Sequence, residues 1–157
     1  MAALALAERT GEVSLNIANA EHAGQNTLGE FMYGGVVSVS RLAVPASTID
    51  DLVAAQFPDG KLDVIKLDLE GAEQRALAGA QHTLRQARPL ILFEALRGAR
   101  GWQGGSIGTM STLFAEAGYS LLCLDPTAGH PVPFGRGAAS DNLVAVHRDR
   151  DWGLLIR

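Results

Sequence analysis

The sequence predicts an α/β fold of the doubly wound type, in which strands and helices alternate along the chain. Two short and almost continuously apolar runs, residues 63–69 and 90–96, are typical of buried parallel strands. Apolar side chains recur at helical spacing between these two runs. With 157 residues, 47% of them apolar, residues 1–157 are expected to form a single domain.

The N-terminal part is expected to contain strands, a loop and one helix. Apolar and polar residues alternate in two segments, as they do in half-buried strands. Thr48 is a suitable N-cap, and Asp50 and Asp51 would lie near the positive end of the helix dipole. The predicted elements are strands 3–7 and 12–18, a loop 19–35, a strand 36–44 ending at Pro45, and a helix from Ser47/Thr48 to Gln56.

The second half begins with the strand 63–69, where acidic residues stand in an apolar segment. Side chains alternate along a strand, so Ile65, Leu67 and Leu69 share an apolar face, while Lys66 and Asp68 share the other and are expected to be buried or half-buried. The remaining predicted elements are a helix 72–87 ended by Pro89, a strand 90–96, a glycine-rich loop 97–108, a helix from Met110 to Ala117, a strand 119–124, a loop 125–140 and a strand 142–147.

Charge and composition exclude several classes of function. The net charge is −4 and no cluster of Lys and Arg occurs, which argues against nucleic-acid binding. The lone Cys123 can form neither an internal disulfide nor a cysteine-based metal site. Residues 1–7 lack a basic segment and are too short to span a membrane, so a cytoplasmic location without membrane contact is expected.

Three acidic residues are candidates for a site at the strand ends. In open α/β sheets, ligands bind beyond the carboxyl ends of the strands, where Asp68 and Glu70 follow one strand and Glu94 ends the next. Lys66 would pair with Asp68 or Glu94, or extend to the surface. The three acids could in principle hold a divalent cation, although the sequence does not require a metal. The four histidines show no ligand spacing and are predicted to be non-catalytic.

Several motifs resemble those of the S-adenosylmethionine (SAM)-dependent methyltransferases of the FkbM type. STIDDL, DVIKLDLEGAE, ALAGAQHTL and RPLILFE follow one another at the spacing of that family, and ALAERTGEVSL and GQNTL resemble its hairpin and its Gly-x-x-Ser-Leu loop. The resemblance covers roughly residues 5 to 147. It implies a Rossmann-like class I methyltransferase sheet that is mostly parallel, with an antiparallel C-terminal strand pair.

The resemblance also implies a reaction and a set of site residues. It implies SAM as the cofactor and O-methylation of a small molecule or sugar, with Asp68 as base or orienter and Glu70 and Glu94 beside it. A positioned carboxylate can align the acceptor and take up its proton. By the same resemblance, Ala5 and Leu6 are expected at the cofactor.

The sequence departs from the family pattern at its N-terminal end. No Gly-rich turn and no strand-ending acid, which bind the cofactor in such enzymes, precede Ala5. The chain is therefore expected to correspond to the C-terminal two-thirds of the fold, as in a fragment, a split protein or one with a misplaced start. In that case the strand 63–69 becomes an open edge, which predicts a homo-oligomer or a missing N-terminal partner.

Two other functions stay open at the level of sequence. The first is a catalytically incomplete remnant or subunit that keeps the scaffold and acts by association. The second is a sugar- or nucleotide-binding domain unrelated to methylation. The loop 97–106 lacks the Gly-Lys-Ser/Thr ending of a phosphate loop, so triphosphate binding has little support; the loop would serve as a lid with Trp102 as a stacking surface, or as a connector.

Overall fold

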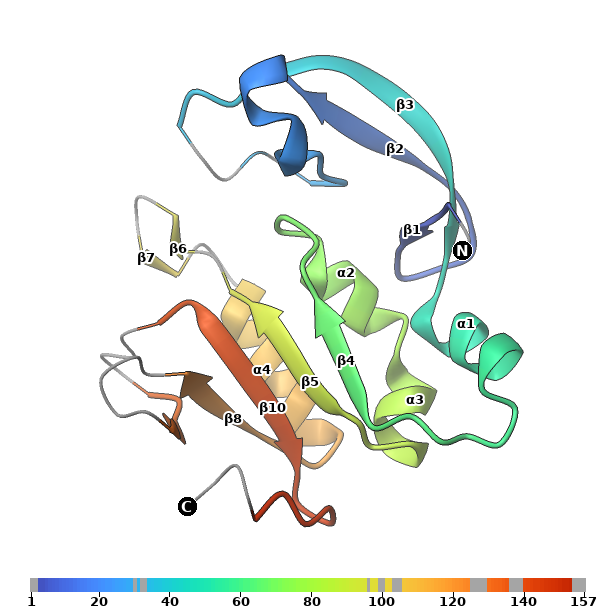
Figure 1. Cartoon of the computed structure of the whole chain (residues 1–157), viewed down its shortest axis with the longest axis vertical. Coiled ribbons are helices and arrows are strands. Elements are labelled where there is room, and N and C mark those ends of the chain that lie inside the picture. The colour runs from blue at the N-terminus through green and yellow to red at the C-terminus, as the bar shows by residue number, and fades with distance from the viewer. Residues whose placement is uncertain are drawn as a thin grey trace.

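The computed structural model describes residues 3–29, 31, 34–95, 97–98, 101–102, 106–124, 130–135 and 140–153. These residues form an α/β fold with mixed sheets (Figure 1). In chain order the elements are β1 (Ala5–Leu6), β2 (Gly11–Ala18), the 3-10 helix η1 (Ala20–Gln25), β3 (Ser38–Ser47), α1 (Ile49–Gln56), β4 (Val64–Leu67), α2 (Glu73–Ala78), α3 (Gln81–Gln86), β5 (Leu90–Glu94), β6 (Arg97–Gly98), β7 (Gly101–Trp102), α4 (Ser106–Glu116), β8 (Tyr119–Leu124), β9 (Pro131–Pro133) and β10 (Asn142–His147).

The main sheet has five strands in the order β4-β5-β10-β8-β9. Among the described strands, β4 and β5 are the one adjacent parallel pair, because the helices α2 and α3 connect them as a crossover. β8 runs in the same direction as these two strands, since both β8 and β5 are antiparallel to β10. The antiparallel C-terminal pair is confirmed, since β10 runs antiparallel to both β5 and β8. The expectation of a mostly parallel sheet is met in part: β4, β5 and β8 run in one direction, but three of the four pairings between the described strands of this sheet are antiparallel. Among the described residues between β8 and β10 there is no helix, and strands joined without a helical crossover pair antiparallel.

The N-terminal strands form a separate sheet rather than extending the main one. Its order is β1-β3-β2, with β2 and β3 antiparallel and the short β1 parallel to the end of β3. We call the long antiparallel pair β2–β3 the ribbon. It arches over the end of the main sheet toward which β4 and β5 point (Figure 1). The strand predicted to stop at Pro45 continues to Ser47, with Pro45 opposite Glu12 in the register.

The helix predicted over residues 72–87 is broken into α2 and α3 at Gly79 and Ala80. Gly79 lies against the backbone of Ala7, so that a side chain here would overlap with the Ala7 carbonyl oxygen. The amide of Asp50 also donates to the Gly79 carbonyl at 3.0 Å. This carbonyl therefore bonds outside the helix, and the close backbone approach explains both the glycine and the interruption.

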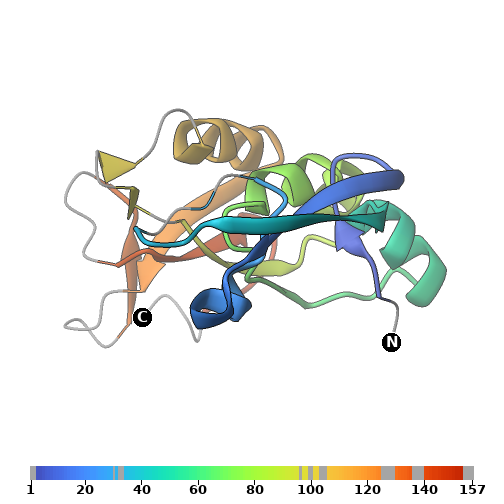
Figure 2. The ribbon, with the colours of Figure 1, turned by 90° about the horizontal axis from the view of Figure 1, so that it is seen from above.

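Helices α2 and α4 lie on one side of the main sheet, as Figure 2 shows from above. The main core fills the space between that face and the helices, and Leu67, Leu84 and Phe114 are among its fully buried side chains. A smaller cluster on other strand positions, including Leu90 and Val144, packs with Trp152 near the C-terminus. Alternation along β5 accounts for the two clusters, since Ile91 belongs to the first and Leu90 to the second.

Two predicted loops lie partly outside the described residues. Residues 97–98 and 101–102 form the small hairpin β6–β7, and the side chain of Trp102 is outside the description, so its stacking role stays a prediction. Within the loop predicted at 125–140, β9 pairs with β8. In the part of the chain that the structure describes, no helix has the length and apolar character needed to cross a membrane.

Candidate functional site

The chain turns sharply after β4, at the place where the sequence put its candidate acids. Glu70 has a φ of 52° and Gly71 a φ of 94°, so two successive residues adopt the left-handed region. Glycine does so without cost, whereas a glutamate does so under strain that the surrounding structure must offset. Glu73, at the start of α2, accepts a hydrogen bond from the Leu69 amide at 2.8 Å and thereby closes the turn. This turn carries Asp68 and Glu70 away from the sheet.

A pocket of about 660 Å³ lies between this turn and the N-terminal sheet. Its volume is in the range of small-molecule and cofactor sites, about 300–1,000 Å³. One wall comes from the residues after β4 and the other from β1, the ribbon and the segment after η1. The lining residues are Ala3, Leu4, Ala5, Leu6, Leu15, Gly24, Asn26, Thr27, Leu28, Val44, Pro45, Asp68, Leu69, Glu70 and Ala72.

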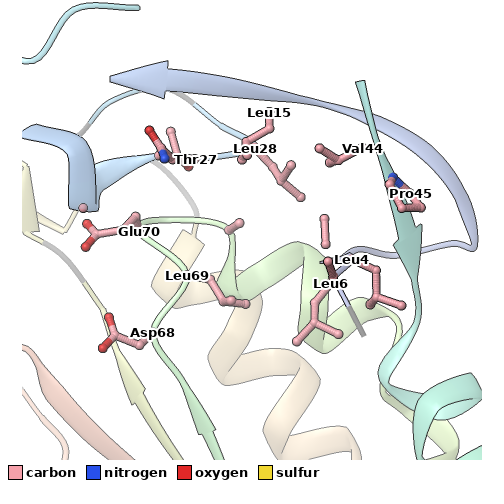
Figure 3. A pocket seen from close by; sticks show the side chains of 15 residues that line it. Leu4, Leu6, Leu15, Thr27, Leu28, Val44, Pro45, Asp68, Leu69 and Glu70 are labelled. Atoms are coloured by element: carbon pink, nitrogen blue, oxygen red, sulfur yellow. The ribbon is translucent and has the colours of Figure 1, made fainter. Parts of the chain in front are cut away.

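The two ends of the pocket differ in chemistry. Figure 3 shows the carboxylates of Asp68 and Glu70 at one end, and the aliphatic side chains of Leu4, Leu6 and Val44 at the other. No Lys, Arg or His belongs to the described lining. Such a pocket suits a ligand with an apolar body and a neutral or cationic hydrogen-bonding end, because an anionic group would meet two carboxylates and no cationic side chain in the described lining.

The acidic groups near the pocket influence one another. Burial, and next the negative charge of Asp68, raise the pKa of Glu70. Burial also raises the pKa of Glu94, with the charges of Asp68 and Glu70 as the next causes. Glu94 is not among the lining residues, but this coupling brings it into the electrostatic field of the site. A group whose pKa is raised toward neutrality is better able to exchange protons with a ligand.

Lys66 and Asp68 form an ion pair at the surface, with Nζ 3.1 Å from Oδ2. The two side chains are 69% and 57% exposed, so the expectation that they are buried or half-buried is wrong. The alternation that led to it is confirmed, because Leu67 is buried while Val64 and Lys66 face outward. Leu67 packs into the main core on one face of the sheet, and Val64 and Lys66 lie on the opposite face, where both are exposed.

The structure brings four of the five sequence-predicted site residues to one pocket. Asp68 and Glu70 line its acidic end, and Ala5 and Leu6 line it from β1. Glu94 lies at the end of β5, the neighbour of β4. Their catalytic and cofactor roles stay predictions.

Sequence reasoning placed too little weight on the segment 26–28 and on Glu73. Thr27 is 1% exposed and pairs with Asn16 of β2 through two backbone hydrogen bonds of 2.8 and 3.2 Å. The GQNTL motif was the available signal for this wall of the pocket. Glu73 is 5% exposed, and burial raises its pKa although backbone amides partly oppose the shift. That burial could not be predicted from the sequence, since a glutamate in a first helical turn is ordinarily solvated.

The described part of the chain offers no metal site of the kind considered from the sequence. No group of three or more His, Cys, Asp or Glu side chains among these residues is arranged to hold an ion. Asp68, Glu70 and Glu94 therefore come close enough to interact electrostatically without forming a ligand set.

Comparison with known proteins gives a family match for most of the chain. The family model of the methyltransferase FkbM domain matches residues 3–121. No curated protein matches. Among solved structures, the crystal structure of methyltransferase FkbM from Methylobacillus flagellatus KT aligns with 92% of this chain at 16% identity and a TM-score of 0.46. The alignment covers 27% of that protein, so the present chain spans only a part of its length.

Proposed function

Since the chain belongs to the methyltransferase FkbM domain family, we propose that it takes part in SAM-dependent methyl transfer to a hydroxyl group, at the pocket between the β4 turn and the N-terminal sheet. The observation that carries this proposal is the position of Asp68 and Glu70. They belong to the LDLEG segment within the matched region, and they stand at the polar end of a pocket of about 660 Å³ whose other end is apolar.

The chemistry of the lining supports the cofactor. SAM supplies an electrophilic methyl group, and its adenine ring, hydroxyl groups and positive charge need an apolar surface and hydrogen-bond acceptors. Leu4, Leu6 and Val44 provide an apolar surface, while the Asp68 and Glu70 carboxylates are acceptors that favour a cation. In our proposal Ala5 and Leu6 contact the cofactor from β1.

Asp68 is the proposed base or orienter. Its carboxylate is solvent-accessible and lines the pocket, so it can accept a hydrogen bond from an acceptor hydroxyl and take up the proton released on methylation. The Lys66 ammonium at 3.1 Å balances part of its charge. Glu70, whose raised pKa makes it readier to hold a proton, would orient the acceptor beside Asp68. Glu94 would contribute through its charge.

The acceptor that fits this pocket is a small molecule or sugar with free hydroxyl groups. Carboxylates are good partners for sugar hydroxyls because each oxygen accepts more than one hydrogen bond. The described lining contains no cationic side chain that could bind a phosphate or a carboxylate. We therefore expect uncharged hydroxyl compounds to be preferred over their phosphorylated or carboxylated analogues.

Titration calorimetry with SAM tests the proposed function. The 157-residue chain should give a saturable heat, and the demethylated product S-adenosylhomocysteine should compete. Leu6→Lys, which puts a cation into the apolar wall opposite the carboxylates, should weaken binding, whereas Lys61→Ala on the distant surface loop should not. No heat with millimolar SAM would rule out the proposal for this chain.

We also propose that the protein associates with a second chain along β4. This strand ends the described sheet, its outer backbone groups are open, and Val64 on it is 50% exposed. An open and partly apolar edge favours pairing with another strand. The partner is either a second copy or a polypeptide that completes the N-terminal side of the sheet. Light scattering that gives the mass of a monomer at all concentrations would exclude the homo-oligomer.

A further inference from the structure

Arg75 connects three segments that are far apart in the sequence. It lies on α2, one turn after the pocket residue Ala72. Its Nε donates to Glu8 Oε2 at 2.8 Å and its Nη2 to Glu8 Oε1 at 3.2 Å, so the guanidinium binds the carboxylate through both oxygens. The remaining Nη1 donates to the carbonyl of Leu28 at 3.3 Å. Glu8 lies in the turn between β1 and β2.

The contacts of Arg75 reach both walls of the pocket. Leu28 lines the pocket, and the segment around it is fastened to the ribbon, since Asn16 Nδ2 donates to the Gly29 carbonyl at 2.7 Å. Asn26 Oδ1 likewise accepts from the amide of Ala18 at 2.9 Å. The segment 26–29 is thus hydrogen-bonded to the ribbon. Arg75 connects the same segment to α2, the helix that follows Asp68 and Glu70. Arg75 therefore connects the two walls of the pocket.

The geometry of the contact distinguishes it from an ordinary surface ion pair. Exposed ion pairs contribute little to folding stability. A bidentate arginine–carboxylate pair is geometrically more specific, and the additional hydrogen bond to a backbone carbonyl further restricts the position of the side chain. The hydrogen bond from Arg75 lowers the pKa of Glu8 to about 2, so both partners stay charged across the neutral range. Lysine cannot reproduce this fork, because its ammonium is a single point charge.

We propose that Arg75 is a positioning residue for the pocket, which holds the Leu28 wall and the Glu8 turn against α2 and so sets the width available to the ligand. The inference rests on the proposed function in that the ligand is taken to be SAM. It assigns to Arg75 no contact with the ligand, and Arg75 is not among the lining residues.

Arg75→Lys is the main test, because it keeps the charge and removes the fork. It should weaken binding of SAM or S-adenosylhomocysteine by roughly tenfold, a usual size for coupling between separate positions. Amide hydrogen exchange in residues 4–6 and 26–28 should become faster, while exchange in α4 stays unchanged. Glu8→Gln keeps Arg75 but removes the carboxylate. It should also weaken ligand binding and speed exchange in residues 4–6 and 26–28, with smaller changes than those of Arg75→Lys.

Thr10→Ala is the matched control. The Thr10 hydroxyl hydrogen-bonds to Asp51 of α1, and this contact also joins the N-terminal sheet to a helix but touches no lining residue. The control should leave ligand affinity and exchange at 26–28 as in the unmodified protein. Equal effects of Thr10→Ala and Arg75→Lys would overturn the proposal, as would an Arg75→Lys protein with unchanged exchange.

The exchange measurement needs no ligand, so it separates the two hypotheses. If the unmodified chain does not bind SAM, the proposed function fails, while faster exchange at 26–28 in Arg75→Lys would still support the positioning role. If the chain binds SAM and Arg75→Lys binds it equally well, the positioning role fails and the proposed function stands. Thermal melting of each variant verifies that it is folded.

Discussion

Replacement of Gly79 by alanine tests the packing between α2 and the N-terminal sheet. The backbone angles of Gly79, φ −88° and ψ 14°, are accessible to alanine, so a penalty must come from space rather than from conformation. An added Cβ would overlap with the carbonyl oxygen of Ala7 and would lie 3.1 Å from Thr48 Cβ and 3.3 Å from its Cγ2. None of these atoms belongs to the free end of a flexible side chain.

The neighbours of Gly79 are held by hydrogen bonds that resist a shift. The amide of Ala7 donates to the Ser47 carbonyl at 3.0 Å, and the amide of Asp50 donates to the Gly79 carbonyl at 3.0 Å. Overpacking of this kind typically costs about 1–3 kcal/mol. It opposes the gain of about 0.4–1 kcal/mol that alanine brings at a compatible backbone position by lowering the entropy of the unfolded chain. We therefore expect the Gly79→Ala protein to be less stable by about 1–2 kcal/mol.

Urea denaturation followed by circular dichroism measures this difference, and Gly108→Ala is the matched control. Gly108 lies within α4 and has no atom within 4 Å of a built Cβ, so alanine there should stabilise by about 0.5–1 kcal/mol. Opposite signs for the two glycines would confirm the packing. If Gly79→Ala were as stable as the unmodified protein, the close approach of α2 to Ala7 would be refuted.

Three further predictions concern the site, the core and the dependence on pH. Asp68→Asn should lower methyl transfer about 10²–10⁴-fold with little change in stability, since the side chain is 57% exposed; full activity in a labelled-methyl assay would remove Asp68 from the chemistry. Phe114→Ala should cost about 3–5 kcal/mol in urea denaturation, because Phe114 is fully buried between Phe93 and Tyr119. Glu94→Gln should stabilise the protein at pH 7. The pKa of Glu94 is raised above its ordinary 4.5 in the folded state, so its contribution to stability is complete below pH 4.5 and is lost as the pH rises through the folded pKa. The advantage of Glu94→Gln should therefore shrink from pH 7 to pH 4, and an advantage that is the same at both pH values would contradict this origin.

Local patterns were sufficient to find most elements of the fold. The apolar runs around Ile65 and Ile91 are strands, and the segments 119–124 and 142–147 are strands with the predicted bounds. The break at Gly79 could not be read from periodicity, because it depends on a contact with Ala7 far away in the sequence. The division into two sheets depends on strand pairing, which alternation along one strand does not specify.

The site was predictable where a general rule connects sequence position with geometry. Asp68 and Glu70 lie at the carboxyl end of a strand, and there the pocket is found. The roles of Arg75 and Leu28 could not be predicted because they depend on tertiary contacts. From sequence alone, an arginine on a helix surface is expected to extend into solvent. The burial of Lys66 and Asp68 was predicted wrongly because it required an element that covers their face of the sheet, and the main core packs on the other face, where Leu67 lies.

Photo-crosslinking of radiolabelled SAM, followed by peptide mapping, tests most directly whether the pocket beside Asp68 is the methyl-transfer site. We predict label on peptides that contain residues 3–6, 24–28 or 68–72, with labelling suppressed by excess S-adenosylhomocysteine. Saturable labelling confined to peptides outside these segments, or no labelling that S-adenosylhomocysteine can suppress, would contradict the assignment of this pocket.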